Sequence, residues 1–323
     1  MTLRPFDTLT ARGKVTRLRT VARCAAARYG LETARMSFVS ESFNTLFRLR
    51  TDHGGDFVLR VGAALRLCPA GTEEVELAWM DALFHDTGLT VAKVVRTTGR
   101  QVVTEASAPG VPEPRMCVVL TWIPGRMLRG HLDPDTAEQS GRLLAELHSH
   151  ARAWSWPPGK AVPVADRVLY WQAASRLASV PRHGSLFAEA LDRAQAAIDS
   201  LWAAPPHPPH LLHGDLTPDN IIQTRRGLAP IDFQDLVWGF DVQDVAISLL
   251  PYQRLEAAPS LTGRFRAGYE DVRPWPEHGA GTLEALFAAR RLHMLNLALN
   301  TRPNHLDGYI DDVAARLARW MSS

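Results

Sequence analysis

The stretch His213-Gly214-Asp215-Leu216-Thr217-Pro218-Asp219-Asn220 decides how this sequence is interpreted. Asp215 and Asn220 lie five positions apart, and a second carboxylate follows a short apolar run in Ile231-Asp232-Phe233. Phosphoryl transfer to an alcohol needs a carboxylate that accepts or orients the hydroxyl proton, oxygen ligands for Mg²⁺ and a cation for the phosphates. Asp215 can supply the first of these, and Asn220 and Asp232 the second.

The residues on either side of this stretch predict short strands at 211–213, 220–223 and 228–231. The last two can pair as a hairpin around Arg225-Arg226-Gly227. Such a hairpin would bring Asn220 and Asp232 to the same end. We therefore expect these two side chains to share one Mg²⁺ ion.

Upstream, the pattern is that of a small antiparallel sheet. Runs 43–50 and 57–61 alternate apolar and polar residues, and Asp52-His53-Gly54-Gly55 between them has turn composition, so a hairpin is expected. Further strands are expected at 101–105 and 116–123, and helices at 12–30 and 72–85.

The composition changes at Pro124-Gly125, after which the segments are mainly helical. Asp135-Thr136-Ala137-Glu138 resembles a capping box at the start of the first helix. Further helices are expected at 166–203, 282–301 and 307–321. We expect an α+β fold with two domains, a nucleotide-binding sheet in 1–123 and a larger, mainly helical part in 124–323 that carries the catalytic and metal loops.

Bulk composition narrows the classes of function. The chain has 323 residues, 46% of them apolar and 22% charged, which suits two packed lobes. A net charge of +2 gives no reason to expect a nucleic-acid or membrane partner. The three cysteines form no CxxC pair, and the N-terminus has no apolar core of signal-peptide length, so a cytoplasmic location is expected.

The motif His213-Gly214-Asp215, with Gly where protein kinases carry Arg, resembles the aminoglycoside phosphotransferase superfamily, which includes choline kinases and type II homoserine kinases. Other segments match in the same order along the chain. They are Phe57-Val58-Leu59-Arg60-Val61, the helix from Glu76 to Leu83, Leu120-Thr121-Trp122-Ile123-Pro124-Gly125, Leu144-Ala145-Glu146-Leu147-His148 and Asp244-Val245-Ala246. The resemblance implies a two-lobed, protein-kinase-like fold.

The resemblance also implies roles for individual residues. Asp215 would orient or deprotonate the acceptor hydroxyl, and Asn220 and Asp232 would hold Mg²⁺. Arg60 stands where most of the superfamily has the phosphate-binding Lys, and Glu76 would be its ion-pair partner, although Glu73 and Glu74 are one turn away. An Arg keeps its charge and offers a bidentate fork, so phosphate binding is expected to survive.

The remaining nucleotide contacts are implied at two places. Ser42 and Asn44 belong to the loop that would cover the phosphates, although Ser40-Glu41-Ser42-Phe43-Asn44 contains no Gly. Backbone atoms of Thr121 and Ile123 would meet the adenine edge. The expected nucleotide is ATP, and nothing in the motifs distinguishes it from GTP.

The acceptor is expected to be a small molecule with a hydroxyl group, bound near Asp235 and Trp238. Residues 160–212 carry four acidic and five basic residues, so no acidic trough for a polycationic aminoglycoside is expected. This leaves an amino-alcohol, a hydroxy amino acid, a sugar, a nucleoside or an antibiotic with few charges. Of Arg290, Arg291 and His293, at least two are expected to be exposed. The chain is expected to be a monomer or a homodimer.

Several alternatives remain open. A Ser/Thr protein kinase is disfavoured because no Arg precedes Asp215. A second alternative is a nucleotide-binding module without transfer activity. A third is a metal-dependent hydrolase built on His213, Asp215 and Asp232. His213 is interpreted as a structural imidazole, and Asp241 with Asp244 as a helix-start pair. His207, His210 and His213 are spaced by three, but the intervening prolines prevent a helix, so no transition-metal site is expected there.

Overall fold

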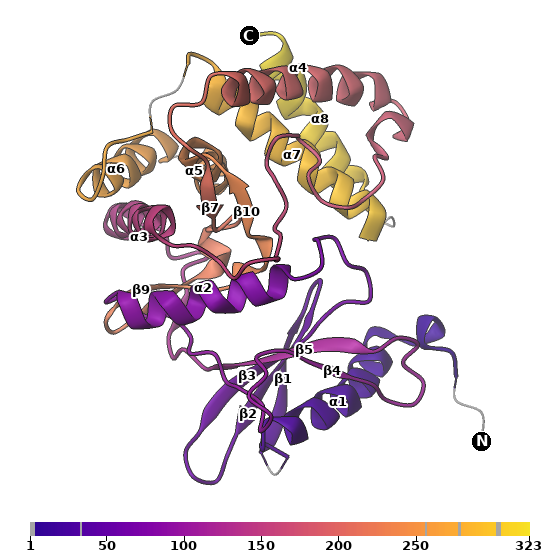
Figure 1. The fold of residues 1–323 in the computed structure, drawn as a ribbon. Helices are drawn as coiled ribbons and strands as arrows, with labels where there is room; N and C mark the ends of the chain where they lie inside the picture. The colour runs from indigo at the N-terminus through magenta and orange to yellow at the C-terminus, as the bar shows by residue number, and fades with distance from the viewer. Residues whose placement is uncertain (1–3, 33, 256, 277–278, 302–304) are drawn as a thin grey trace. The chain divides into compact units, whose positions relative to one another are not determined.

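The computed structural model describes residues 4–32, 34–255, 257–276, 279–301 and 305–323 (Figure 1). The chain folds into two compact units. Unit 1 contains Met1–Arg66, Glu73–Pro124 and Trp156–Lys160, and unit 2 contains Leu67–Thr72, Gly125–Ser155 and Ala161–Ser323. The sequence suggested a single division between 123 and 124, whereas each unit here also includes a short segment from the other side of that point.

Unit 1 is built on a five-stranded antiparallel sheet with the order β1-β2-β3-β5-β4. Its strands are Arg35–Glu41, Thr45–Arg50, Asp56–Val61, Thr104–Ala106 and Arg115–Thr121, for β1 to β5 in chain order. The predicted hairpin is confirmed, because β2 and β3 pair in register around the Gly54-Gly55 turn. The edge strand β1 was not predicted. Its residues are nearly all exposed, and only Met36 and Phe38 alternate with polar residues before Val39 interrupts the pattern.

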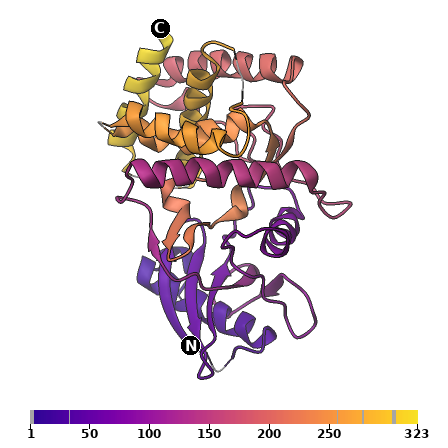
Figure 2. The ribbon, with the colours of Figure 1, turned by 90° about the vertical axis from the view of Figure 1, so that its left-hand side faces the viewer.

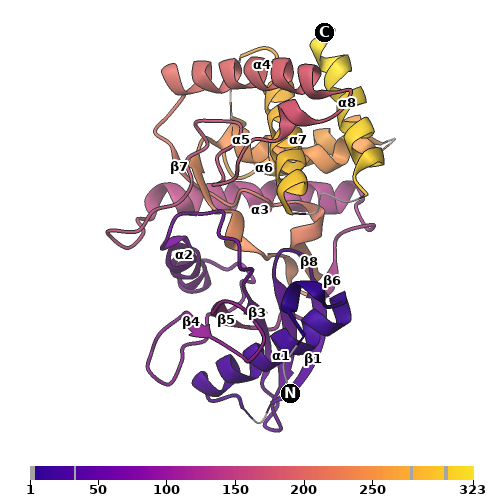
Figure 3. The ribbon, with the colours of Figure 1, turned by 90° about the vertical axis from the view of Figure 1, so that its right-hand side faces the viewer.

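Helix α1 (Ala11–Arg28) lies against this sheet, as Figure 3 shows. Thr10 caps it, with its hydroxyl accepting a hydrogen bond from the Gly13 N–H. The buried Val21, Ala22 and Ala25 pack in one cluster with Phe47 and Leu59 of the sheet. Helix α2 (Thr72–Asp86) carries the predicted nucleotide-site residue Glu76.

Unit 2 is mainly helical. Its helices are α3 (Pro134–Ala153), α4 (Gly184–Ala203), α5 (Asp241–Leu249), α6 (Ala258–Glu270), α7 (Thr282–Thr301) and α8 (Asp307–Met321). Its short strands are β6 (Arg126–Met127), β7 (His210–Leu212), β8 (Ile221–Thr224), β9 (Gly227–Pro230) and β10 (Val237–Gly239). They form a β6-β8-β9 sheet and a β10-β7 pair. No described helix combines the length and the apolar character that a membrane span requires.

Two helix predictions in unit 2 need correction. The predicted helix 166–203 is wrong in its first half, since α4 begins only at Gly184. Backbone N–H groups before α4 bond to distant side chains instead of forming helix hydrogen bonds. Val168 N–H donates to the Gln195 side chain, and Arg176 N–H donates to the Asn296 side chain. The capping box of α3 is formed by Asp133 and Thr136, not by Asp135, because Pro134 fits the first helical position.

Two glycines allow α3 and α6 to cross at very short distance (Figure 2). A Cβ atom on Gly141 of α3 would lie 1.8 Å from the carbonyl oxygen of Phe265. A Cβ atom on Gly268 of α6 would lie 1.9 Å from the carbonyl oxygen of Glu138. Both contacts are with backbone, which cannot rotate away, so the crossing requires glycine on each helix.

We predict that Gly141→Ala lowers the free energy of unfolding by about 1–3 kcal/mol, because the added methyl group forces the two helices apart. Gly263→Ala is the matched control, since this α6 glycine has open space where the methyl group would go. Its helix propensity should leave stability unchanged or raise it by up to about 1 kcal/mol. Urea unfolding measures both variants, and equal effects at the two positions would contradict the close crossing.

Candidate active site

The loop that carries Asp215 begins with a glycine that no other residue could replace in this conformation. Gly214 has φ +76°, and a Cβ atom there would lie 2.0 Å from the carbonyl oxygen of Asp235. This close approach follows from the pairing of β7 with β10, which sets Leu212 opposite Val237. The segment after Ile231 is thereby packed directly against the loop.

Asp244 of α5 fixes the backbone of the same loop. Its Oδ2 accepts a hydrogen bond from His213 N–H and its Oδ1 one from Gly214 N–H, both at 3.0 Å. Burial raises the pKa of Asp244, but the His148 contact and the amide donors outweigh it, so the pKa lies below its usual value. Asp244 lies in the first turn of α5, as the helix-start interpretation expected, and its fully buried side chain also ties α5 to the loop.

The geometry of His213 matches the structural imidazole expected from sequence. Nδ1 accepts a hydrogen bond from Asp215 N–H at 3.3 Å, so Nε2 carries the proton and donates to the Ile231 carbonyl at 3.2 Å. The ring also packs on Phe233, with ring centres 4.6 Å apart. Burial lowers the pKa of His213, which keeps the imidazole neutral.

The predicted hairpin of β8 and β9 is confirmed, with Ile221 opposite Pro230. Ile231 N–H donates to the Asn220 carbonyl at 3.0 Å, which sets Asn220 and Asp232 at the same end of the hairpin. Asn220 Nδ2 donates to Asp215 Oδ2 at 2.6 Å and to the Asp215 carbonyl at 3.0 Å. Because the amide nitrogen faces Asp215, the amide oxygen of Asn220 is left for another partner.

The electrostatics of this group suit a bound cation. Burial and the nearby charge of Asp232 raise the pKa of Asp215, Arg290 and Asn220 oppose this, and the pKa that results is about 6. Asp232 itself is exposed and adopts a left-handed conformation at φ 62°, an unusual state for a residue other than glycine. Two carboxylates that repel each other, beside an amide oxygen, are the hard oxygen donors that Mg²⁺ prefers.

Arg290 of α7 contacts the predicted catalytic carboxylate, and the sequence analysis missed it. Its Nη2 lies 2.7 Å from Asp215 Oδ1 and 3.9 Å from Asp235 Oδ2, and its Nη1 donates to the Tyr170 hydroxyl at 3.2 Å. The expectation of surface exposure is wrong for Arg290 and His293, which are both buried, while Arg291 is half-buried. The uninterrupted apolar run just before Arg290, residues 285–289, was the signal for a buried position.

Aromatic residues hold the segment beside Arg290. Tyr170 stacks on His293 with ring centres 4.1 Å apart, and Trp171 packs on the same imidazole at 4.2 Å. His293 Nδ1 donates to the Val168 carbonyl, and burial together with Arg290 lowers the pKa of His293 to about 3. Of the two predicted acceptor residues, Asp235 lies beside Arg290, and Trp238 lies in β10 with its backbone bonded to the segment 163–165.

Arg60, the cation of unit 1 that is predicted to bind the phosphates, is fixed by an ion pair. Arg60 of β3 and Glu76 of α2 form a two-pronged pair, with nitrogen–oxygen distances of 2.6 and 2.7 Å. Both residues are buried. Glu74 instead pairs with Lys160 at 3.1 Å, so the structure assigns Glu76 as the partner of Arg60.

The predicted loop and hinge contacts also lie in unit 1. Ser42 and Asn44 form the turn between β1 and β2, where Asn44 Oδ1 accepts a hydrogen bond from Ala63 N–H at 3.0 Å. In the hinge, Trp122 N–H bonds to the Asp56 carbonyl, so strand alternation turns the Thr121 carbonyl away from β3. Within the described part of the chain, Ile123 forms no backbone hydrogen bond.

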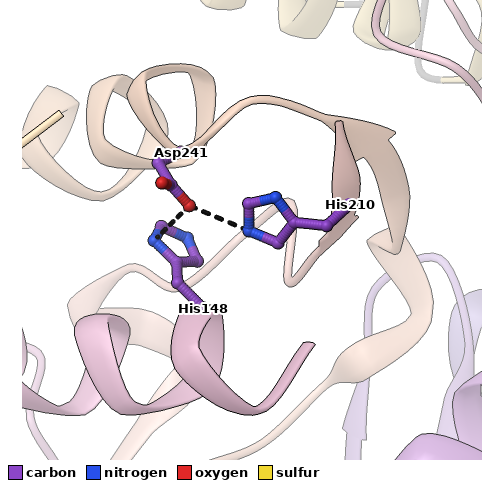
Figure 4. Close-up of side chains that lie close together, drawn as sticks. All are labelled: His148, His210 and Asp241. Atoms are coloured by element: carbon purple, nitrogen blue, oxygen red, sulfur yellow. Dashed lines mark ion pairs between the residues drawn. The ribbon is translucent and has the colours of Figure 1, made fainter. Parts of the chain in front are cut away.

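A second buried group, the Asp241 cluster, lies in unit 2 (Figure 4). Asp241 Oδ1 lies 3.1 Å from His148 Nδ1 and 2.8 Å from His210 Nε2, and these three atoms are close enough together to bind a metal ion. However, Asp241 Oδ2 is paired with Arg152 at 2.5 Å and Arg273 at 3.1 Å.

These two guanidiniums already offset the carboxylates of Asp241 and Asp244, so a dication would add uncompensated buried charge. The cluster is therefore best described as an ion-pair network that joins α3, β7 and α5. Asp241 is the first residue of α5, as the helix-start interpretation expected, and its side chain is engaged in this network. His213, the third histidine of the sequence pattern, bonds to Asp215 N–H and to the Ile231 carbonyl instead.

Known proteins share this architecture. An aminopropanol kinase associated with a microcompartment is 22% identical with a TM-score of 0.75, over 94% of this chain and 95% of that one. An amicoumacin kinase in complex with AMP-PNP and Ca²⁺ is 17% identical with a TM-score of 0.72, over 96% and 94%. An aminoglycoside phosphotransferase with ADP and hygromycin B is 17% identical with a TM-score of 0.59, over 94% and 97%. No curated protein sequence matches.

These likenesses confirm the expected α+β, kinase-like fold, with an antiparallel sheet in one unit and a mainly helical second unit. The sequence profile of the phosphotransferase enzyme family matches residues 38–280, which is most of the chain and includes every predicted site residue up to Asp244. The chain belongs to the phosphotransferase enzyme family.

Proposed function

We propose that this protein is an ATP-dependent kinase that transfers the γ-phosphate to a hydroxyl group of a small molecule. The observation that carries the proposal is the arrangement of Asp215, Asn220 and Asp232, with Asn220 bonded to Asp215 and at the same end of one hairpin as Asp232. Family membership and the kinase names of the similar structures support it.

In the proposed reaction, the acceptor hydroxyl oxygen forms a bond to the γ-phosphorus of ATP. The bond from that phosphorus to the bridging oxygen of ADP breaks, and the hydroxyl proton passes to the carboxylate of Asp215. The products are a phosphate monoester and ADP. Asp215 must be ionised to accept the proton, and Asn220 and Arg290 hold its two oxygens in place.

Asn220 and Asp232 would hold Mg²⁺, which supplies positive charge to the phosphates when bound. On the nucleotide side, Arg60 contacts the phosphates, kept in position by Glu76. Ser42 and Asn44 cover the phosphates, and the Thr121 carbonyl and Ile123 N–H receive the base. We propose ATP as the nucleotide that makes these contacts. GTP is the nucleotide to compare with it in an assay.

The acceptor side of unit 2 suits a molecule of low charge. Arg290 offsets one of the negative charges of Asp215 and Asp235, which weakens the field that would attract a polycation. We infer that the acceptor is an amino-alcohol, a hydroxy amino acid, a sugar, a nucleoside or an antibiotic with few charges, placed near Asp235 and Trp238. Location in the cytoplasm and a monomeric or homodimeric state stay predictions.

We predict that Asp215→Ala abolishes phosphoryl transfer and leaves ATP binding intact, because Asp215 acts on the acceptor and not on the nucleotide. A panel of hydroxylated metabolites and antibiotics, followed by ADP release, measures transfer, and calorimetry measures ATP binding. Asp219→Ala is the matched control from the same loop, since Asp219 is an exposed residue paired with Arg129 at the surface. Turnover by Asp215→Ala would remove this residue from its role.

A panel in which no acceptor is phosphorylated while ATP still binds would instead favour a nucleotide-binding module without transfer activity. Phosphate appearing on a Ser or Thr peptide would favour the protein-kinase alternative.

We predict that Asp232→Asn raises the Mg²⁺ concentration needed for half-maximal turnover, because it removes the charged metal ligand and leaves an amide. Asp235→Asn should leave the Mg²⁺ requirement unchanged and alter the KM of the acceptor. Turnover measured against Mg²⁺ and against acceptor concentration separates the two. The same change in Mg²⁺ requirement for both variants would contradict the assignment of Asp232.

A further inference from the structure

A group of arginines gathers in unit 2 that the proposed transfer reaction does not use. They come from three elements, namely the short 3₁₀ helix Leu250–Arg254 after α5, helix α7 and helix α8, and α7 packs against α8 (Figure 1). This arginine cluster consists of Arg254, Arg291, Arg316 and Arg319. The side chains lie close enough together for the charges of the other three to act on Arg291. Four positive charges therefore meet from positions that are distant in sequence.

Asp312 of α8 is the carboxylate that the arginine cluster contacts. Arg316 Nε lies 3.0 Å from each of its two oxygens, and Arg254 Nη2 lies 3.8 Å from Oδ2. The hydrogen bond from Arg316 holds the pKa of Asp312 below its usual value, so this carboxylate is ionised. The neighbouring Asp311 pairs with His183 instead, at 3.0 Å. Among the described residues, one negative charge is thus set against four positive ones.

Arg291 is the member of the cluster with the least compensation. Its Nη2 donates to the side-chain oxygen of Gln253, which is neutral, and no carboxylate of the described residues lies within ion-pair distance of it. The residue is half-buried, and burial together with the neighbouring arginines lowers the pKa of Arg291 to about 10. A half-buried cation among like charges is unfavourable unless an anion offsets it. The cluster therefore lacks negative charge.

The hydroxyl of Tyr309 in α8 lies near the same charges. Burial keeps the pKa of Tyr309 above its usual value, although Arg254 and Arg290 oppose this. The phenol is therefore neutral and can donate a hydrogen bond to an anion. Because Arg290 also contacts Asp215, Tyr309 is close both to the arginine cluster and to the predicted acceptor side of unit 2.

We propose that Arg254, Arg291 and Tyr309 form an anion site in unit 2 that binds a phosphate or carboxylate group. A guanidinium donates paired N–H groups to either oxyanion. Cations that converge from three elements on one half-buried position suit a small anion, whereas an extended polyanion is bound by cations along a stripe. The oxyanion can belong to the acceptor or to a separate small molecule, since both present the same chemistry.

Inorganic phosphate is the probe, titrated by calorimetry into the full chain with ADP and Mg²⁺ present. We expect saturable binding that weakens as the salt concentration rises. Arg291→Gln should weaken it about tenfold or more, because a charge-assisted hydrogen bond is lost. Arg266→Gln is the matched control, since this exposed arginine of α6 is paired with Glu270 at 2.9 Å, and it should bind phosphate as the unaltered protein does.

Asp312→Asn tests the same site in the opposite direction. It should tighten phosphate binding by about two- to fivefold, because it removes the carboxylate that competes for the arginines. Arg291→Lys keeps the positive charge and should retain more binding than Arg291→Gln. Thermal unfolding of each variant shows that it is folded, and the gain expected for Asp312→Asn cannot arise from misfolding.

Turnover of the acceptor panel distinguishes the two sources of the oxyanion. If it belongs to the acceptor, Arg291→Gln should raise the KM of acceptors that carry a carboxylate or phosphate and leave the KM of uncharged acceptors unchanged. Phosphate should then compete with the charged acceptors. If it belongs to a separate molecule, phosphate should bind without competing with any acceptor. Either result supports the anion site.

Other outcomes overturn it. The anion site is wrong if the unaltered protein binds no phosphate, if Arg291→Gln and Arg266→Gln bind it equally well, or if Asp312→Asn binds it more weakly. A panel in which no acceptor is phosphorylated counts against the proposed kinase function alone, because phosphate binding is measured without turnover.

Discussion

The carboxylate of Asp244 is the interaction on which the predicted catalytic apparatus of unit 2 depends. One fully buried side chain accepts hydrogen bonds from two consecutive amides of the loop that leads to Asp215. Without it, those amides would be buried and unsatisfied, at a cost of roughly 1–3 kcal/mol each. Because Asp244 lies in a helix, the loop takes its position from a rigid element. His148 contacts the same carboxylate and links it to the Asp241 cluster.

Two different kinds of interaction therefore act on Asp215. The first is backbone geometry, set by Asp244 and by the strand pairing that packs Gly214 against Asp235. The second is electrostatic, set by Arg290 against the opposing effects of burial and Asp232. The first sets where the carboxylate lies, and the second places a positive charge beside it. On the nucleotide side, the Arg60–Glu76 pair combines position and charge in a single contact.

The sequence predicted well those elements whose signals lie within a few neighbouring residues. The β2–β3 and β8–β9 hairpins follow from alternation and turn residues within a few positions, and α7 and α8 have the predicted bounds. The candidate site was predictable only where its members lie close together in sequence, as Asp215 and Asn220 do. Arg290 is 75 residues from Asp215, and no local pattern encodes their contact. The helix predicted over residues 166–176 was wrong for the same reason. Backbone N–H groups in this segment donate hydrogen bonds to distant side chains of α4 and α7.

The glycine at 214 has a consequence for how this protein can change over generations. A side chain at this position would strike the carbonyl oxygen of Asp235. An arginine there, as in protein kinases, would need both a different backbone conformation and a displaced neighbouring segment. A substitution at this one position supplies neither. On the proposed function, acceptor preference would change through side chains such as Asp235 and Trp238, with the loop itself left as it is.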